Sequence, residues 1–475
     1  MWAPRSQTVR SWLYAVAGAA LVSACAVGPN YHRPQTPVAA QFGNAGEPGL
    51  GQGDAVEHYW TAFADPTLDS LIDDALAHNK GLAVAVANLQ AARAARRLAG
   101  FDQFPTITAA GGYTHNLDAQ QQLPGVPQSL REFDTAQAGF DGLWELDLFG
   151  RVRRNVEAAR GDLGASEASL QDARVSVIAE IARDYFILRG LQDQLALTLR
   201  NADNQLNTTK LTHNRLEAGR GNELDTSRAE AQWQTTVASI PSLQASIATT
   251  TYRLSVLTGR QPTALSEQLS PQAPMPALPP LTSIGTPEQL LRRRPDVRVA
   301  ERRLAAATAR VGVAMGDYFP KVTLVGEVGY WAPTFGDFGQ SEARFFSAGP
   351  SISWAAFDLG RVHARVSSAK AQTDAAIAGY EGAVLNALED TEGSLIAYGR
   401  SQSRRQSLQV AAAASDKAAD LARKRFEGGL IDFLEVLDAE RTALSAELLL
   451  SQSRTDAATS LVAVYKALGA GWATR

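Results

Sequence analysis

The stretches Trp144-Glu-Leu-Asp-Leu-Phe-Gly-Arg151 and Trp354-Ala-Ala-Phe-Asp-Leu-Gly-Arg361 share a pattern and lie about 210 residues apart. A second pair, Arg215-Leu-Glu-Ala-Gly219 and Arg425-Phe-Glu-Gly-Gly429, has the same separation. A repeat of this length exceeds the period of solenoid proteins, so each copy must be a large structural unit. We therefore expect an internally duplicated chain with approximate twofold symmetry.

Each copy contains two segments in which apolar residues alternate with a period of two. The second segment, for example, places Phe140 and Trp144 on one face. We predict strands over residues 106–114, 135–147, 321–331 and 345–357. Each is about long enough to cross a membrane, but four strands cannot close a barrel in lipid. Closure therefore requires several copies of the chain, although the strands alone leave open a soluble β-domain with paired hairpins.

A long segment without proline follows each second strand. Residues 149–216 and 359–426 predict helices of roughly 100 Å. Each helix then meets a glycine break, at Gly219 and Gly221 or at Gly428 and Gly429, after which a second helix is predicted. The predicted helical hairpins span residues 149–257 and 359–468.

The N-terminus has the form of a secretion signal. Two arginines precede a short apolar stretch, which ends at Val22-Ser-Ala-Cys25. This ending resembles the lipobox of bacterial lipoproteins, in which the cysteine is acylated and becomes the mature N-terminus. Ala26 follows, which favours the outer membrane over inner-membrane retention. A cleaved signal with an incidental cysteine is the alternative.

These boundaries divide the chain into five parts. We expect a signal peptide over residues 1–24, a lipidated linker over 25–60, a first repeat over 61–270, a proline-rich linker over 271–287 and a second repeat over 288–475.

Composition narrows the classes of function. The net charge of −4 argues against nucleic acid as a partner. The histidines show no metal-ligand spacing, and no nucleophile elbow or phosphate-binding loop occurs, so we expect no enzymatic activity, no metal and no cofactor. We interpret Arg292-Arg-Arg294 as a solvated cluster.

The lipobox, the following Val27-Gly-Pro-Asn-Tyr31, the duplicated strand pairs and the paired glycine turns together resemble the TolC/OprM-type outer-membrane factor family, lipoprotein branch. The resemblance implies a mixed α and β membrane protein whose homotrimer forms a 12-stranded β-barrel in the outer membrane, continued by an α-helical barrel across the periplasm. It implies two further partners, a periplasmic adaptor protein and an inner-membrane transporter of the RND type, in a tripartite multidrug efflux system. Three indoles are expected at the lipid interface: Trp144, Trp331 and Trp354.

The resemblance also assigns candidate residues at the hairpin tips. It implies an acidic periplasmic constriction at Glu435 and Asp438, with Asp225 as the counterpart in the first copy. Carboxylates repeated around an axis would select cations or hold a gate. Helix capping is the alternative for Glu435 and Asp225, because each follows a potential N-cap residue by three positions.

Two arginines sit four residues before a turn glycine in equivalent positions. Arg215 and Arg425 could pair with tip carboxylates, contact the adaptor together with the tip glycines, or simply complement the negative end of the helix dipole.

The sequence favours a passive outer-membrane conduit that exports drugs or other small toxic compounds. A duct for type I protein secretion has the same architecture and remains an alternative. A lipid-anchored coiled-coil tether or adhesin is the alternative from another class, but a tether has no need for the alternating strands.

Overall fold

The computed structural model describes residues 26–44, 46, 58–280 and 284–470. The predicted signal peptide and Cys25 lie outside the described residues. The chain divides into two compact units. The first consists of Met1–Gln35, Asn88–Glu167 and Val299–Glu381, and the second of Thr36–Ala87, Ala168–Arg298 and Gly382–Arg475.

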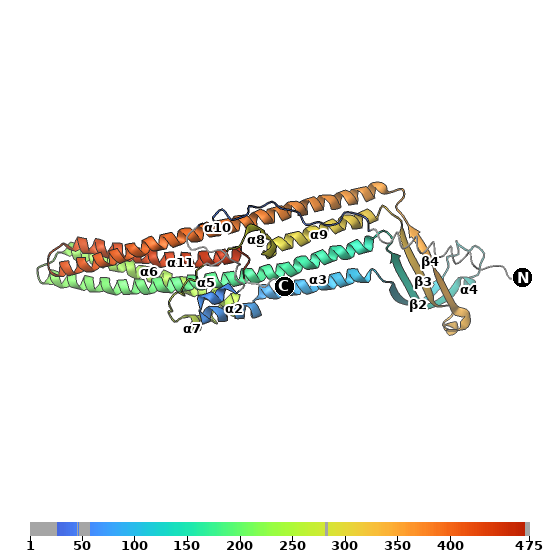
Figure 1. Cartoon of the computed structure of the whole chain (residues 1–475). Coiled ribbons are helices and arrows are strands. Elements are labelled where there is room, and N and C mark those ends of the chain that lie inside the picture. Colours follow the sequence, from blue (N-terminus) through green and yellow to red (C-terminus); the bar gives the residue numbers. More distant parts are fainter. Residues whose placement is uncertain (1–25, 45, 47–57, 281–283, 471–475) are drawn as a thin grey trace. The chain divides into compact units, whose positions relative to one another are not determined.

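The two copies contain the same five main elements in the same order, which confirms the internal duplication (Figure 1). In the first copy they are α3 (Lys80–Phe101), β1 (Thr106–Leu117), β2 (Glu132–Leu146), α5 (Arg151–Glu217) and α6 (Glu223–Leu257). In the second they are α9 (Pro295–Gly316), β3 (Lys321–Ala332), β4 (Arg344–Ser353), α10 (Leu359–Glu427) and α11 (Phe433–Ala467). Shorter elements are η1 (Tyr59–Phe63), α2 (Pro66–His78), α4 (Gln128–Arg131), α7 (Ser266–Leu269), α8 (Pro287–Arg293), η2 (Phe335–Asp337) and η3 (Ser341–Ala343).

The four strands form one antiparallel sheet in the order β1-β2-β3-β4. Among the described residues, β1 and β4 therefore each have one edge without a hydrogen-bonded strand. Nearly all residues of β1 and β4 are exposed, so this sheet is not packed against a core of its own chain. The expected fourth strand was too long. It ends at Ser353, because Asp358 N–H donates to Ala355 O in a turn that leads into α10.

The strand register gives the sheet one apolar and one polar face. Ala109, Phe140, Val328 and Phe346 form one cross-strand row, and the adjacent row on the opposite face is Thr108, Asp141, Glu327 and Ser347. Side chains alternate between faces along a strand, so each row extends to positions two residues away. The sheet thus has the two-sided polarity of a strand set between an apolar medium and water.

The same register corrects one predicted indole. Trp144 pairs with Leu324 on the apolar face, whereas Trp331 pairs with Gln137 and shares the face of Glu327. The expectation that Trp331 lies with Trp144 at the lipid interface is therefore wrong, because the two residues have opposite parity in the paired strands.

Trp144 and Trp354 make equivalent contacts in the two copies. The indole N–H of Trp144 donates to Gln103 O at 3.0 Å, and that of Trp354 donates to Tyr318 O at 3.0 Å. Each acceptor directly precedes a Phe-Pro pair at the start of a strand. The repeated pattern around the two tryptophans thus reflects a repeated hydrogen bond.

Asn79 separates two consecutive helices, α2 and α3. The side chain of Asn79 causes the break, since its Oδ1 accepts the N–H of Leu82 at 3.1 Å and its Nδ2 donates to Leu257 O at 2.8 Å. This amide caps the start of α3 and ties it to the end of α6.

The second unit contains the largest apolar core. Tyr59 and Tyr465 stack there with ring centroids 4.4 Å apart, and Tyr185 and Leu254 are fully buried. The Tyr185 hydroxyl donates to the Asp65 carboxylate at 2.6 Å. In the described parts of the chain, no helix is sufficiently long and apolar to cross a membrane.

Candidate functional site

The two hairpin tips have the same backbone geometry. Gly219 N–H donates to Leu216 O at 2.9 Å, and Gly429 N–H donates to Phe426 O at 2.9 Å. Both glycines have positive φ, 68° and 73° respectively, which is the left-handed conformation that ends a helix in a Schellman motif. The tip of each hairpin is therefore set by one glycine whose conformation other residues adopt only at a cost.

The equivalent tip arginines have different surroundings. Arg215 donates from Nη1 to Phe426 O at 3.1 Å, and its guanidinium carbon lies 4.3 Å from the centroid of the Phe426 ring. Arg425 is exposed, and its side chain makes no hydrogen bond or ion pair with another described residue. Arg215 thus joins the two tips of one chain and does not pair with a tip carboxylate.

The predicted acidic residues differ in how they are held. Asn222 caps α6, with its Oδ1 accepting the N–H of Asp225 at 2.9 Å and its Nδ2 donating to the Asp225 carboxylate at 2.8 Å. At the second tip Asp432 occupies the N-cap position but makes no side-chain cap hydrogen bond. Glu435 and Asp438 are exposed. The capping alternative therefore describes Asp225, while Glu435 has no capping partner among the described residues and its side chain is exposed.

A buried carboxylate lies close to the tips and was not predicted. Glu440 is only 7% exposed. Its Oε1 accepts a hydrogen bond from the Thr208 hydroxyl at 3.3 Å and forms an ion pair with Arg423 at 3.0 Å. Its position on the inner face of α11, two residues after Asp438, could have been recognised from the apolar periodicity of that helix.

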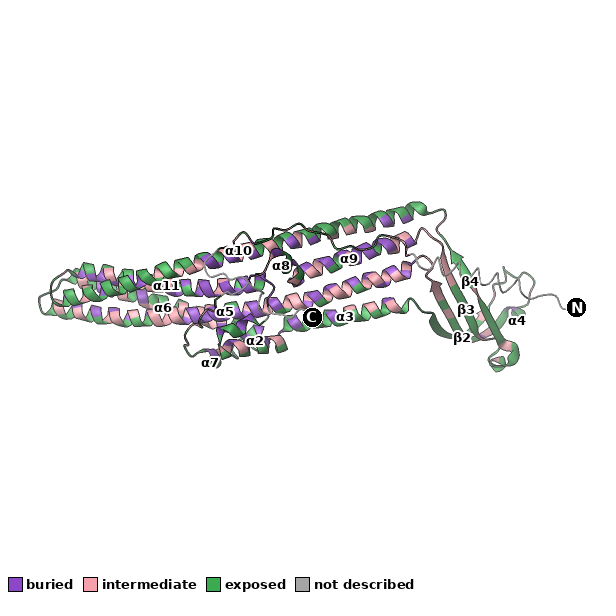
Figure 2. Ribbon diagram, viewed as in Figure 1, coloured by how far each residue is buried: buried purple, intermediate pink, exposed green. Residues whose placement is uncertain are grey.

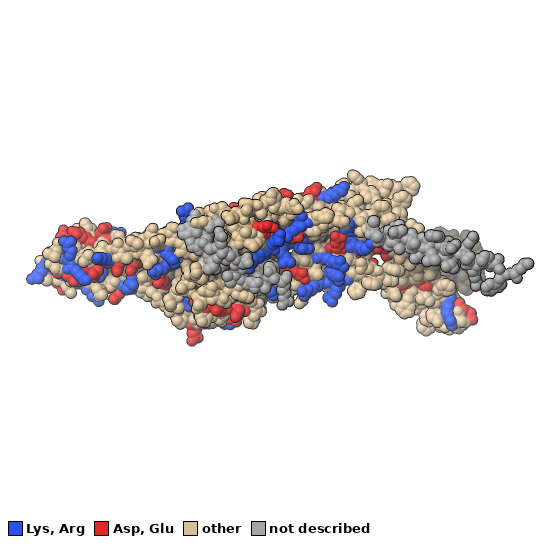
Figure 3. Space-filling model, viewed as in Figure 1, with Lys and Arg blue, Asp and Glu red and all other residues tan. Residues whose placement is uncertain are grey.

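A polar cavity of about 300 Å³ borders Glu440. Its lining also includes Arg200 and Glu447, which pair at 2.6 Å, and Gln205, whose buried Oε1 has no hydrogen-bond partner. The interior of this hairpin region is thus polar and roomy enough for water. Figure 3 shows basic and acidic side chains interspersed over the hairpin ends.

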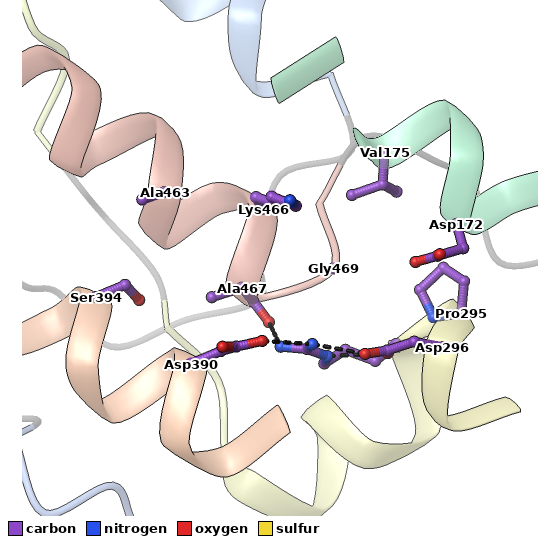
Figure 4. A pocket seen from close by; sticks show the side chains of 11 residues that line it. Asp172, Val175, Pro295, Asp296, Asp390, Ser394, Ala463, Lys466, Ala467 and Gly469 are labelled. Atoms are coloured by element: carbon purple, nitrogen blue, oxygen red, sulfur yellow. Dashed lines mark hydrogen bonds and ion pairs between the residues drawn. The ribbon is translucent and has the colours of Figure 1, made fainter. Parts of the chain in front are cut away.

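Arg294 lies in a second cavity of about 210 Å³, shown in Figure 4. Its guanidinium pairs with Asp296 at 2.6 Å and with Asp390 at 3.0 Å, and it donates to Ala467 O at 3.1 Å. Burial alone would lower the pKa of Arg294, but the hydrogen bonds to both carboxylates raise it. The interpretation of Arg292–Arg294 as a solvated cluster is therefore wrong for Arg294, which is 8% exposed.

Asp172 lines the same cavity. Burial raises the pKa of its carboxyl, and the nearby charge of Asp296 raises it further. The cluster gathers residues from α5, α10, α11 and the start of α9, so it joins both copies where the second one begins.

The segment that follows Cys25 is held as an ordered strap in the first unit. Arg154 donates to Val27 O at 3.1 Å and to the Asn30 side chain at 2.8 Å, and Tyr31 donates to Glu301 at 3.2 Å. Ala26 lies against Gly150, where a side chain would not fit. The sequence did not reveal these anchors, because Arg154 and Glu301 are ordinary charged residues on long helices.

Within the described ranges, no group of three or more His, Cys, Asp or Glu side chains is placed to hold a metal ion. The charged clusters instead make ion pairs and hydrogen bonds between helices.

The model of the outer membrane efflux protein family matches residues 71–260 and 286–470, once in each copy. The chain belongs to the outer membrane efflux protein family. Outer membrane protein OprJ of Pseudomonas aeruginosa is 31% identical over 459 residues, covering 95% of this chain and 94% of that protein. The toluene efflux pump outer membrane protein TtgC of Pseudomonas putida is 31% identical over 469 residues, covering 98% and 96%.

The fold of this outer membrane efflux protein is also that of a solved channel. The structure of the outer-membrane channel OprN has a TM-score of 0.88 and 43% sequence identity, and the match covers 94% of this chain and all of that one. The chain is thus an outer-membrane efflux channel with helices that extend into the periplasm, and the coiled-coil tether is set aside.

Proposed function

We propose that this efflux channel is a homotrimer in which twelve strands close one β-barrel in the outer membrane and the helical hairpins form a periplasmic tunnel. The sheet carries this proposal. In the part of the chain that the structure describes, four strands form a sheet with an open edge at β1 and at β4, and such edges would leave backbone groups unsatisfied in lipid. A barrel of twelve strands is wide enough to enclose an aqueous lumen.

The polarity of the two faces of the sheet decides which face meets lipid in the proposed barrel. The row of Phe140, Val328 and Phe346 faces lipid, and the row of Asp141, Glu327 and Ser347 faces the lumen.

Cys25 carries the lipid anchor in this proposal. Ala26 lies against Gly150, only four residues after β2 ends at Leu146. The acyl chains would therefore begin next to the end of the sheet, at the membrane surface.

The tip carboxylates form the periplasmic constriction in this proposal. Glu435 and Asp438 are exposed, so threefold repetition would gather six negative charges at one mouth. Asp225 is held by Asn222 and contributes a further, less mobile charge in each chain. A narrow mouth with this potential favours cations and resists anions.

The partners are a periplasmic adaptor and an RND-type inner-membrane transporter, which supplies the energy. The exposed turns around Gly219, Gly221, Gly428 and Gly429 offer the adaptor a contact surface. Arg425 is exposed beside them, whereas Arg215 is held by Phe426. The substrate class is small toxic organic compounds, in keeping with the toluene efflux named for the relative TtgC. Transport through the channel is passive and involves no catalytic step.

Planar-bilayer recording of the purified, lipidated protein tests this function. We expect discrete single-channel conductance from a trimeric species, and Asp438→Ala should raise the conductance or lower the preference for cations. Glu288→Gln is the control, since its exposed carboxylate lies in α8 and pairs with the exposed Arg292. A stable monomer without conductance would refute the proposal, and unchanged currents in Asp438→Ala would remove that residue from the constriction.

A further inference from the structure

Because the two copies are equivalent, the contact of Arg215 with Phe426 indicates what its counterpart, Arg425, could contact. Residues 210 positions apart are equivalent at the tips, so Arg425 corresponds to Arg215 and Leu216 to Phe426. Arg215 reaches across to the next hairpin of its own chain. The described residues contain no third hairpin that Arg425 could reach in the same way, and Arg425 is exposed.

Phe426 O, which accepts the hydrogen bond from Arg215, corresponds to Leu216 O in the first copy. Phe426 O accepts two hydrogen bonds, from Gly429 N–H at 2.9 Å and from Arg215 at 3.1 Å. Leu216 O accepts the equivalent bond from Gly219 N–H at 2.9 Å, and no side chain among the described residues donates to it. A carbonyl oxygen can accept two hydrogen bonds, so Leu216 O can accept one more.

The helix faces around these residues differ in the same way. On α5, Leu211 packs against a tip cluster that includes Phe433 and Val436 of α11. Its counterpart on α10, Leu421, is 50% exposed. Figure 2 shows that α10 is exposed along much of its length, and α6 is likewise more exposed than its counterpart α11. The face of α10 that corresponds to the packed face of α5 is therefore uncovered among the described residues. The same holds for the face of α6 that corresponds to the packed face of α11.

We infer that Arg425 of one copy lies over Leu216 of a neighbouring copy of this chain and donates to its carbonyl oxygen, with α10 packed on the neighbour's α6. This rests on the homotrimer proposed above. Three chains with two equivalent hairpins each can close a ring if the second hairpin of one chain meets the first hairpin of the next in the arrangement seen within the chain.

We call the contact between two neighbouring hairpins a seam. The seam within one chain and the proposed seam between copies differ in the side chains that they bring together. Within the chain, Arg200 pairs with Glu447 at 2.6 Å and Thr208 donates to Glu440 at 3.3 Å. The equivalent positions between copies are Val410 facing Val237 and Ala418 facing Glu230. Between copies, an apolar Val410–Val237 pair therefore replaces the Arg200–Glu447 ion pair, while Glu230 keeps a carboxylate opposite the small side chain of Ala418. Arg425 supplies the cationic contact beside the turn.

Heterologous cross-linking tests the contact. Differently tagged copies, one with Arg425→Cys and one with Leu216→Cys, are co-expressed, and the purified trimers are treated with a short bismaleimide. We expect a covalent dimer that carries both tags. The matched control places Arg215→Cys and Phe426→Cys on separate copies, and its yield should be at least tenfold lower because these residues meet within one chain. The chain with only its native cysteine, Cys25, sets the background.

A second pair keeps the test independent of the arginine. Ala418→Cys and Glu230→Cys on separate copies should also cross-link, because their counterparts Thr208 and Glu440 are in contact. Native mass spectrometry of the same samples distinguishes a failure of the proposed contact from a failure of the proposed homotrimer. Trimers that give no tagged dimer from either pair would overturn this contact and leave the trimer standing, whereas monomers would overturn both.

Discussion

Arg294 Nη2 donates to Asp390 Oδ2 at 3.0 Å, which ties the start of the second copy to the middle of its long helix α10. The same guanidinium bonds Asp296 and the carbonyl oxygens of Ala387 and Ala467. One buried cation thus satisfies groups from three segments that are distant in sequence. It acts as a joint between the end of α8 and the hairpin of the second copy.

Replacing Arg294 by Ala should lower the free energy of unfolding by about 1–3 kcal/mol, because it leaves buried acceptors without a donor. Thermal melting of the purified protein in detergent measures the change. Arg292→Ala is the control from the same triplet. Its side chain is exposed and pairs with the exposed Glu288, so the expected loss is below about 1 kcal/mol. Equal losses in both variants would contradict the joint.

Asp172 gives the protein a specific pH dependence. Its pKa is raised by burial and by Asp296, so the folded state holds this proton at pH values where the unfolded chain has released it. The free energy of unfolding therefore falls as the pH rises from the ordinary carboxyl pKa through the raised one. Asp172→Asn should raise the melting temperature at neutral pH. It should also reduce the decrease in melting temperature that accompanies a rise of pH through the acidic range.

The control for this pH dependence is Asp203→Asn, which changes an exposed carboxylate on the same helix. Its melting curve should follow that of the unaltered protein from pH 4 to pH 8. A neutral-pH melting temperature for Asp172→Asn that is equal to or below that of the unaltered protein would show that the Asp172 charge is not destabilising.

The sequence predicted the architecture because its signals are local and duplicated. The Trp144 and Trp354 motifs, the glycine turns and the alternating strands each reflect backbone geometry that a short stretch determines. The contacts that bind the copies together were not predictable in this way. Arg294 is a buried charge inside a run of three arginines, and most of its partners, Asp390 and the carbonyl oxygens of Ala387 and Ala467, lie on other helices. The apolar periodicity of α11 places Glu440 on the buried face, but it does not reveal the partner Thr208 on α5.

The same reasoning explains the errors. Trp331 was assigned by residue type, but only the pairing register fixes the face on which a strand residue lies. Asp432 and Glu435 have capping-box spacing without the hydrogen bonds, because spacing permits a cap but does not orient the side chain.

The two adjacent glycines of the second tip should respond differently to alanine. Gly429 has φ of 73°, and a Cβ there costs roughly 1–2 kcal/mol. Gly428 has no positive φ, and the nearest atom to an added Cβ is 3.6 Å away. Hydrogen exchange of residues 419–440 should show a lower opening free energy in Gly429→Ala and little change in Gly428→Ala. The same response in both would argue against the left-handed turn as the determinant of the tip.

The two faces of the sheet predict opposite outcomes for neighbouring substitutions in β4. Phe346 belongs to the apolar row and is 84% exposed, whereas Ser347 lies in the polar row opposite Glu327. An arginine on the lipid face of a membrane strand costs about 2–4 kcal/mol near the bilayer midplane, while one facing the lumen stays in water. Phe346→Arg should therefore reduce the amount of heat-modifiable trimer in outer-membrane fractions.

Ser347→Arg should assemble to the normal level and shift the ion preference of the channel toward anions, because its charge would lie in the lumen. Both variants add the same charge at nearly the same height on the strand, so the net charge is matched between them. If Ser347→Arg failed to assemble while Phe346→Arg reached the membrane, the assignment of the two faces would have to be reversed. Since β4 pairs with β3 and β3 with β2, that reversal would extend through the register to Asp141 and Phe140.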